Sequence, residues 1–174
     1  MEDVQVTQET VIGDLTDVKE QKQIVPASSG VLMRITKAGT MASKNGDIKS
    51  LKLELRIVDG ILVTDAETGE QEVKYKNKPM FTSMIDLPYW CDTAVKTSKW
   101  WQTKQYLINF KKLCIALDID IKSVTVNDAF LESLIDRELI VDIRHEENQV
   151  KNPETGDYVG DGTFREKLVN FRKV

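Results

Sequence analysis

The sequence is poor in the residues that build metal sites and disulfide frameworks. Its 174 residues include two cysteines, Cys91 and Cys114, and a single histidine, His145. The cysteines match no Cys-x-x-Cys spacing, so neither a zinc knuckle nor a disulfide framework can be assembled. We therefore expect no metal, no cofactor, and two reduced thiols whose role is packing.

Long apolar runs are also lacking. No stretch approaches the roughly 18 apolar residues that a membrane span requires. The first residues, Met1-Glu2-Asp3, have neither the basic nor the apolar part of a signal peptide. These absences predict a soluble, cytoplasmic protein with no membrane partner, and its 41% hydrophobic and 30% charged residues are typical of one globular domain.

Recognisable catalytic motifs are absent as well. There is no Gly-rich phosphate loop, no Ser-His-Asp set and no nucleotide-binding fingerprint. The carboxylate pairs Asp118/Asp120 and Glu146/Glu147 could be imagined as ligands of a two-metal nuclease, but helix capping and turn formation explain surface Asp and Glu more simply. His145 has no second histidine to complete a His-Glu-x-x-His motif. We expect no catalytic residues and no enzyme activity.

The charges that are present are segregated along the chain. The net charge is -4, and residues 1–30 alone hold six acids and two bases, so the remaining body is neutral with 22 of each sign. Within that body, no acid occurs from Thr93 to Leu117, where there are five lysines. The overall acidity therefore conceals a basic patch that could face nucleic acid.

The first half of the chain predicts an acidic, loosely ordered leader over residues 1–30 and a folded domain over residues 31–174. In the stretch 51–58, leucine and isoleucine alternate with charged residues, which is typical of a half-buried strand. The Asn45-Gly46 step predicts a hairpin before it, and a second turn is expected at 65–70. The predicted strands are Val31–Ala38, Leu51–Val58 and an irregular one at Met80–Leu87.

The second half predicts helices followed by strands. Ser98 is a plausible N-cap for a helix whose apolar side includes Phe110, Leu113 and Leu117 at helical spacing. A long, polar, turn-rich loop is expected between the last two strands. The predicted elements are helices Ser98–Leu117 and Asn127–Ile135, a strand Leu139–Arg144, a flexible loop Glu146–Gly162 and a strand Thr163–Arg172.

This order of elements favours a mainly β fold. Three strands, a helix and two further strands are the sequence of a five-stranded OB-fold, with the helix between strands three and four. We expect such a barrel, preceded by the extended acidic segment.

The second half of the chain also resembles a known family. The resemblance rests on a helix ending near Ala116-Leu117-Asp118, the segment Phe130 to Leu139, the strand 139–144, and the closing Leu168-Val169-Asn170-Phe171. In these features the chain resembles phage-encoded single-stranded DNA-binding proteins of the OB-fold type. The resemblance covers residues 30–174 and implies a role in phage DNA replication or recombination.

Single-strand binding requires cations for the phosphates and flat rings on which bases stack. The acid-free stretch, the outward faces of the strands and the basic last strand supply both, although solvated surface charge is the competing interpretation. On the last strand, Phe164 and Phe171 lie on opposite faces, so either ring could be the exposed one. The candidate DNA-binding residues are Arg34, Lys52, Arg56, Lys99, Trp101, Lys104, Lys111, Arg144, Tyr158, Arg165, Lys167 and Phe171.

The preferred hypothesis is a non-sequence-specific single-stranded DNA-binding protein. Its acidic leader would recruit replication or recombination proteins, and self-association into a homo-oligomer is open. The alternative is a protein-interaction module or phage structural component that uses the same barrel, which the acidic isoelectric point of 5.2 favours.

Overall fold

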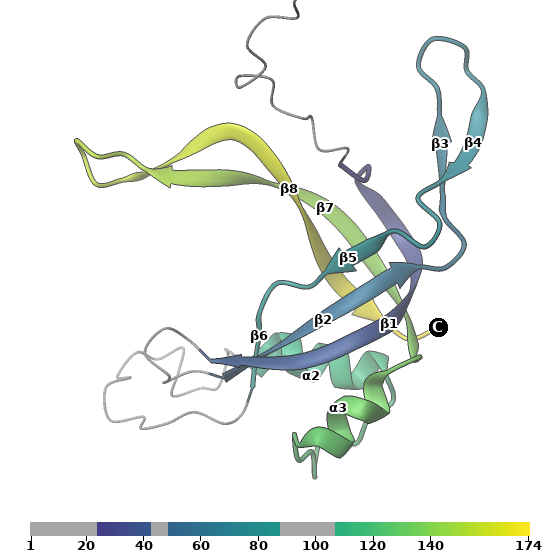
Figure 1. Ribbon diagram of the computed structural model, residues 1–174, viewed down its shortest axis with the longest axis vertical. Coiled ribbons are helices and arrows are strands. Elements are labelled where there is room, and N and C mark those ends of the chain that lie inside the picture. The colour runs from purple at the N-terminus through teal and green to yellow at the C-terminus, as the bar shows by residue number, and fades with distance from the viewer. Residues whose placement is uncertain (1–23, 43–48, 88–106) are drawn as a thin grey trace, which may run out of the picture.

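The computed structural model describes residues 24–42, 49–87 and 107–174. These residues form a mainly β structure in which one antiparallel sheet curls strongly into a half-barrel (Figure 1). Two helices lie together at one end of the curled sheet, and two ribbons of paired strands project from the other end (Figure 1). The expectation of a mainly β fold is thus confirmed, and the curled sheet is consistent with the expected barrel.

The half-barrel is built from five strands with one short addition. Its hydrogen-bonded path runs β5-β2-β1-β7-β8, and β6 pairs with the other end of β2. The two ends of the path, β5 and β8, approach each other without pairing in the described part of the chain. The strands are β1 (Ser28–Ala42), β2 (Lys49–Ile57), β5 (Pro79–Phe81), β6 (Ile85–Asp86), β7 (Glu138–Lys151) and β8 (Tyr158–Arg172).

Strand β2 shows why this sequence forms a two-faced sheet. Leu51, Leu53, Leu55 and Ile57 are fully buried, while Lys52 and Arg56 between them are exposed and Glu54 on the same outward face is 8% exposed. Each buried leucine contributes roughly 1.5–3 kcal/mol relative to an exposed one, which fixes the inward face. The predicted alternation is confirmed, and it determines which side chains of β2 point outward.

The first two long strands are antiparallel neighbours, as predicted. Their pairing runs from Met33 opposite Ile57 to Ala42 opposite Lys49, and a bulge interrupts it between Ile35 and Lys37. The predicted Asn-Gly turn at 43–48 lies outside the described residues.

The first strand begins before its expected start at residue 31. Strand β1 starts at Ser28, and Val25 is fully buried. The Val25 N–H donates to the Glu166 carboxylate at 3.1 Å, and its carbonyl accepts from His145 Nε2 at 2.8 Å. Small residues at 27–30 carry no apolar alternation, so the sequence pattern gave no sign of this strand start.

A separate hairpin follows β2. It consists of β3 (Ile61–Thr64) and β4 (Gln71–Lys74), which pair only with each other (Figure 1). The predicted turn at 65–70 is confirmed, because the Asp65 carboxylate accepts from the N–H groups of Glu67 and Thr68 at 2.9 and 2.8 Å. The irregular third strand expected at 80–87 is present as the two short strands β5 and β6.

The helices are α2 (Ile108–Ala116) and α3 (Asp128–Leu134). Helix α2 buries Phe110, Leu113 and Cys114, as its spacing predicts, and burial raises the pKa of the Cys114 thiol to about 11. Helix α3 begins as expected after Asn127, whose side chain accepts from the Phe130 N–H at 2.9 Å. The predicted N-cap Ser98 and the other cysteine, Cys91, lie outside the described residues.

The prediction of a long flexible loop at 146–162 was wrong. Strands β7 and β8 continue past the half-barrel as a two-stranded ribbon, paired up to Lys151 opposite Tyr158, and only 152–157 form a turn. We call residues 144–151 and 158–167 the β7–β8 ribbon. Residues 158–165 of this ribbon are all exposed, whichever face of the strand they are on. The sequence therefore shows no alternation of apolar and polar residues that would predict a strand here.

Candidate nucleic-acid interface

The first group of predicted residues lies on the outward surface of β1, β2 and β5. Arg34, Lys52 and Arg56 are all exposed there, because they alternate with the buried side chains of the half-barrel. Arg34 lies opposite Arg56 in the β1–β2 pairing. We call this surface the sheet face and define it by Arg34, Lys37, Lys52, Arg56 and Phe81.

Two carboxylates partly neutralise the sheet face. Glu54 binds the Lys37 amine at 2.8 Å and lies 3.7 Å from the Arg56 guanidinium, and the bond from Lys37 is the main cause of its lowered pKa. Arg34 pairs with Glu138 at 2.7 Å, and this hydrogen bond raises the pKa of Arg34.

Phe81 is a feature of the sheet face that the sequence reasoning missed. Its ring is 55% exposed, and the Lys52 amine lies 5.7 Å from the ring centroid. Phe81 stands opposite Glu54 in the β2–β5 pairing, next to buried Met80. The three residues of β5 alternate between exposed and buried, as in any two-faced strand. This short alternation is the signal in the sequence that could have identified Phe81 as exposed.

The β7–β8 ribbon carries the second group. Tyr158 is 68% exposed near its tip. Closer to the half-barrel, Arg165 and Lys167 both bind Glu146, at 2.8 and 2.5 Å. These two bonds lower the pKa of Glu146, and the bond from Lys167 has the larger effect. The ribbon therefore presents cations whose charge is shared with a carboxylate.

The two phenylalanines of β8 differ in accessibility. Phe164 is half exposed, whereas Phe171 is only partly accessible and packs against the core. The pairing of β7 and β8 shifts near Ile140, and Asn170 has a positive φ of 56°. This irregularity turns Phe171 inward, so Phe164 is the freely exposed ring of this strand.

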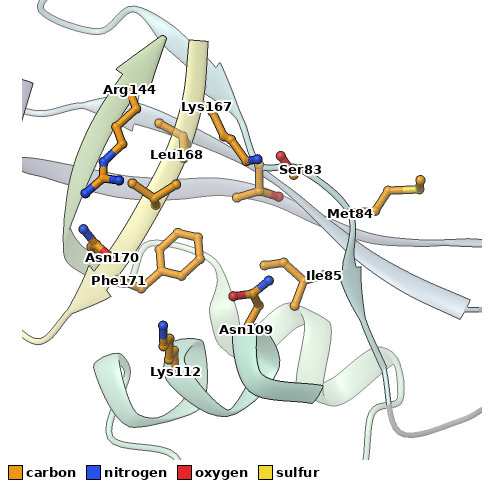
Figure 2. Close-up of a pocket in the computed structure, with 12 residues that line it drawn as sticks. Ser83, Met84, Ile85, Asn109, Lys112, Arg144, Lys167, Leu168, Asn170 and Phe171 are labelled. Carbon is orange, nitrogen blue, oxygen red and sulfur yellow. The ribbon is translucent and has the colours of Figure 1, made fainter. Parts of the chain in front are cut away.

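The third group surrounds a cleft of about 260 Å³ (Figure 2). Arg144 and Lys167, cross-strand neighbours on β7 and β8, line it together with Phe171. Asn109 and Lys112 of α2 and the segment 82–85 complete the lining. We call this cavity the α2–β8 cleft.

The remaining predicted residues lie elsewhere. Lys111 is exposed on α2 and does not line the α2–β8 cleft. Lys99, Trp101 and Lys104 lie outside the described residues. The described candidates therefore fall on three surfaces, the sheet face, the ribbon and the cleft, and Lys111 stands apart from them.

Comparison with known proteins does not assign the chain to a family. No family model matches it, and no curated protein is significantly similar to it. In the described residues, no three or more His, Cys, Asp or Glu side chains are grouped so that they could hold a metal ion. None of the helices in these ranges has the length and apolarity to span a membrane.

Proposed function

We propose that this chain is a non-sequence-specific single-stranded DNA-binding protein that acts in phage DNA replication or recombination, in the host cytoplasm. The observation that carries the proposal is the exposed Phe81 ring beside Lys52, on a face that also presents Arg34 and Arg56. Single strands are bound by this combination, since bases stack on rings while cations follow the phosphates.

An OB-like reading of the half-barrel supports this placement. If β5 and β6 together serve as the third strand, then β1, β2, this strand, β7 and β8 follow the OB order, with helices between the third and fourth strands. OB-folds bind oligonucleotides on the face of strands two and three and on the flanking loops. The corresponding surface here is the sheet face.

The chemistry of the sheet face favours binding without sequence preference. Phosphate contacts carry no sequence information, and stacking is tolerant because every base has a π-face. Glu54 and Glu138 reduce the net positive charge of the face, so stacking on Phe81 has to supply a large share of the affinity.

The direct test is a fluorescence titration with oligo-dT that follows the quenching of Trp90, Trp100 and Trp101. We expect saturable binding that weakens with salt, with a slope of about -0.7 per phosphate contact in a plot of log affinity against log salt concentration. Binding that is absent, or unaffected by salt, would overturn the proposal.

A matched pair of ring deletions locates the interface. Phe81→Ala should weaken oligo-dT binding about 5- to 150-fold, the effect of losing one stacked base. Phe164→Ala removes an equally exposed ring from the ribbon and should leave the affinity within about twofold. If the two variants behave alike, the sheet face is not the main binding surface.

A second candidate function is a protein-interaction module or a phage structural component. Exposed apolar pairs favour it, because Leu62 stands opposite Val73 on the β3–β4 hairpin and Val150 opposite Val159 on the ribbon. Binding of single-stranded DNA does not require these exposed apolar pairs. Affinity capture after nuclease treatment tests it, because a defined partner that is retained by the chain and lost by Leu62→Asp would favour this function.

The acidic residues 1–30, with a net charge of -4, are proposed to recruit replication or recombination proteins. Deleting residues 1–23 should leave oligo-dT binding intact or slightly stronger, because negative charge is removed. The same deletion should abolish capture of such partners in a pull-down with nuclease-treated extract.

A further inference from the structure

The α2–β8 cleft differs in charge from the other cationic surfaces of the molecule. Lys112, Arg144 and Lys167 line it from three elements, α2, β7 and β8 (Figure 2). Among the 12 residues that line it, none is acidic. The described cations of the sheet face, by contrast, include three that are ion-paired with carboxylates of the same face.

Two of these cations keep their charge available. Lys167 is paired with Glu146, but neither Lys112 nor Arg144 forms an ion pair with any other described residue. Asp142, two residues from Arg144 on the same strand, feels the Arg144 charge, which is the last of the causes that lower its pKa. Its carboxylate oxygens are bound instead by the Gly30 N–H, Asn170 and Arg172. The cleft is therefore ready to accept an anion.

The other lining groups add a flat surface and amide groups. Phe171 presents its ring to the cleft beside Ile85, and the Asn109 amide comes from α2 (Figure 2). In the described part of the chain, the Asn109 side chain has no hydrogen-bond partner of its own. The volume, about 260 Å³, is slightly below the roughly 300 Å³ at which clefts for drug-sized ligands begin, which fits one small unit and not a polymer segment.

We infer that the α2–β8 cleft binds one phosphorylated nucleoside, with the phosphate at Lys112 and Arg144 and the base against Phe171. A guanidinium and an amine together suit a phosphate, and an aromatic ring suits a base. This site is separate from the sheet face, so the inference does not depend on the proposed function. The ligand is either the terminal nucleotide of a bound strand or a free mononucleotide.

Calorimetric titration with dTMP tests the inference, with thymidine and inorganic phosphate as partial ligands. We expect saturable dTMP binding that is at least about tenfold tighter than that of either partial ligand, since each supplies only half of the contacts. Failure of dTMP to saturate, or equal binding of dTMP and inorganic phosphate, would overturn the proposal.

The chain offers a closely matched control on one helix. Lys112→Glu should weaken dTMP binding about tenfold or more, whereas Lys111→Glu makes the same charge change at an exposed neighbour outside the cleft and should leave it unchanged. Circular dichroism of both variants checks that the fold is intact. Equal losses in the two variants would show a general charge effect and overturn the assignment.

A third arm separates the two ligand sources. If 5′-phosphorylated oligo-dT binds more tightly than the unphosphorylated strand, and Lys112→Glu removes the difference, the ligand is a strand terminus. If the two strands bind alike while dTMP saturates, the ligand is a free nucleotide. Saturable dTMP binding without any oligo-dT binding would overturn the proposed function and support the nucleotide site in the cleft. Oligo-dT binding without saturable dTMP binding would support the proposed function and overturn the nucleotide site.

Discussion

The sheet face and the β7–β8 ribbon carry the same arrangement of charges on different supports. Each has one glutamate that pairs with two cations, and each has one phenylalanine that is about half exposed. The cations of Glu146 both lie on the neighbouring strand, whereas Glu54 pairs with Lys37 on β1 and with Arg56 on its own strand. The sets are Glu54 with Lys37 and Arg56 on the sheet face, and Glu146 with Arg165 and Lys167 on the ribbon.

The difference lies beneath these side chains. The Glu54 side chain is 9% exposed and stands between buried Leu53 and Leu55, whereas that of Glu146 is 35% exposed. A binding surface loses less conformational entropy on association when its side chains are already held in place. The comparison teaches that similar pairs of charges can differ in how well they are organised before a ligand arrives.

The largest expected difference between the two regions is in stability. Leu53→Ala removes a fully buried side chain beneath the sheet face and should lower the free energy of unfolding by about 2–5 kcal/mol. Val150→Ala, on the exposed ribbon, should change it by less than about 0.5 kcal/mol. Urea unfolding of both variants measures the contrast, and a similar cost at both positions would show that the ribbon has its own buried support.

Charge reversal should separate the two regions in binding. Lys52→Glu, beside the Phe81 ring, is expected to weaken oligo-dT binding about tenfold and to reduce the salt slope by about 0.7. Arg165→Glu on the ribbon should have a smaller effect. Salt-dependent titrations of both variants provide the measurement, and a larger loss for Arg165→Glu would place the strand on the ribbon instead.

Acid stability should depend on Asp142, at the junction of the two regions. Its pKa is lowered, first by the bond from Asn170 and then by the Gly30 N–H, so the folded state binds the proton less readily than the unfolded state. Its contribution is therefore present above the unfolded pKa of about 3.9 and is lost as the pH falls through the folded pKa.

The variant Asp142→Asn should have a lower free energy of unfolding than the parent chain at pH 7. The gap between the two should begin to narrow as the pH falls to the unfolded pKa of about 3.9 and should continue to narrow toward the lower folded pKa, because the unfolded state of the parent chain takes up the proton first. Urea midpoints measured from pH 7 to pH 3 test this, and a gap that stays constant across that range would contradict it.

The smallest expected effect is a gain in binding. Glu54→Gln removes the anion that pairs with Lys37 and Arg56, both of which are exposed although Glu54 is not. Oligo-dT affinity should therefore rise about two- to fivefold, the effect of freeing exposed cations from one ion pair. Glu146→Gln is the matched change on the ribbon and should raise it less. A loss of affinity in Glu54→Gln would show that this carboxylate matters more for positioning the cations than for offsetting them.

The parts of the fold that the sequence predicted are those in which one face is buried. Strand β2 alternates over Leu51 to Ile57, and helix α3 has a capping residue at Asn127, so local rules were sufficient. The β7–β8 ribbon has no buried face near its tip, so only the pairing of two distant segments defines it. A long polar stretch that forms strands cannot be told from a loop by periodicity.

The candidate site was likewise predicted in part, mainly where its residues lie on strands with one buried face. Arg34, Lys52 and Arg56 were found through the alternation of their strands, while Phe81 lies on a strand of three residues and was missed. The inward turn of Phe171 depends on the irregular pairing near Asn170, which no property of a single strand reveals. The α2–β8 cleft joins residues from distant parts of the chain.

The buried Cys114 gives the protein an internal reporter of core opening. With a thiol pKa of about 11, only about one molecule in ten thousand carries the reactive thiolate at pH 7. In a Cys91→Ser background, alkylation of Cys114 should therefore proceed mainly through states in which α2 has moved away from the sheet. The labelling rate then measures how often this helix lifts, with no added dye or spectroscopic tag.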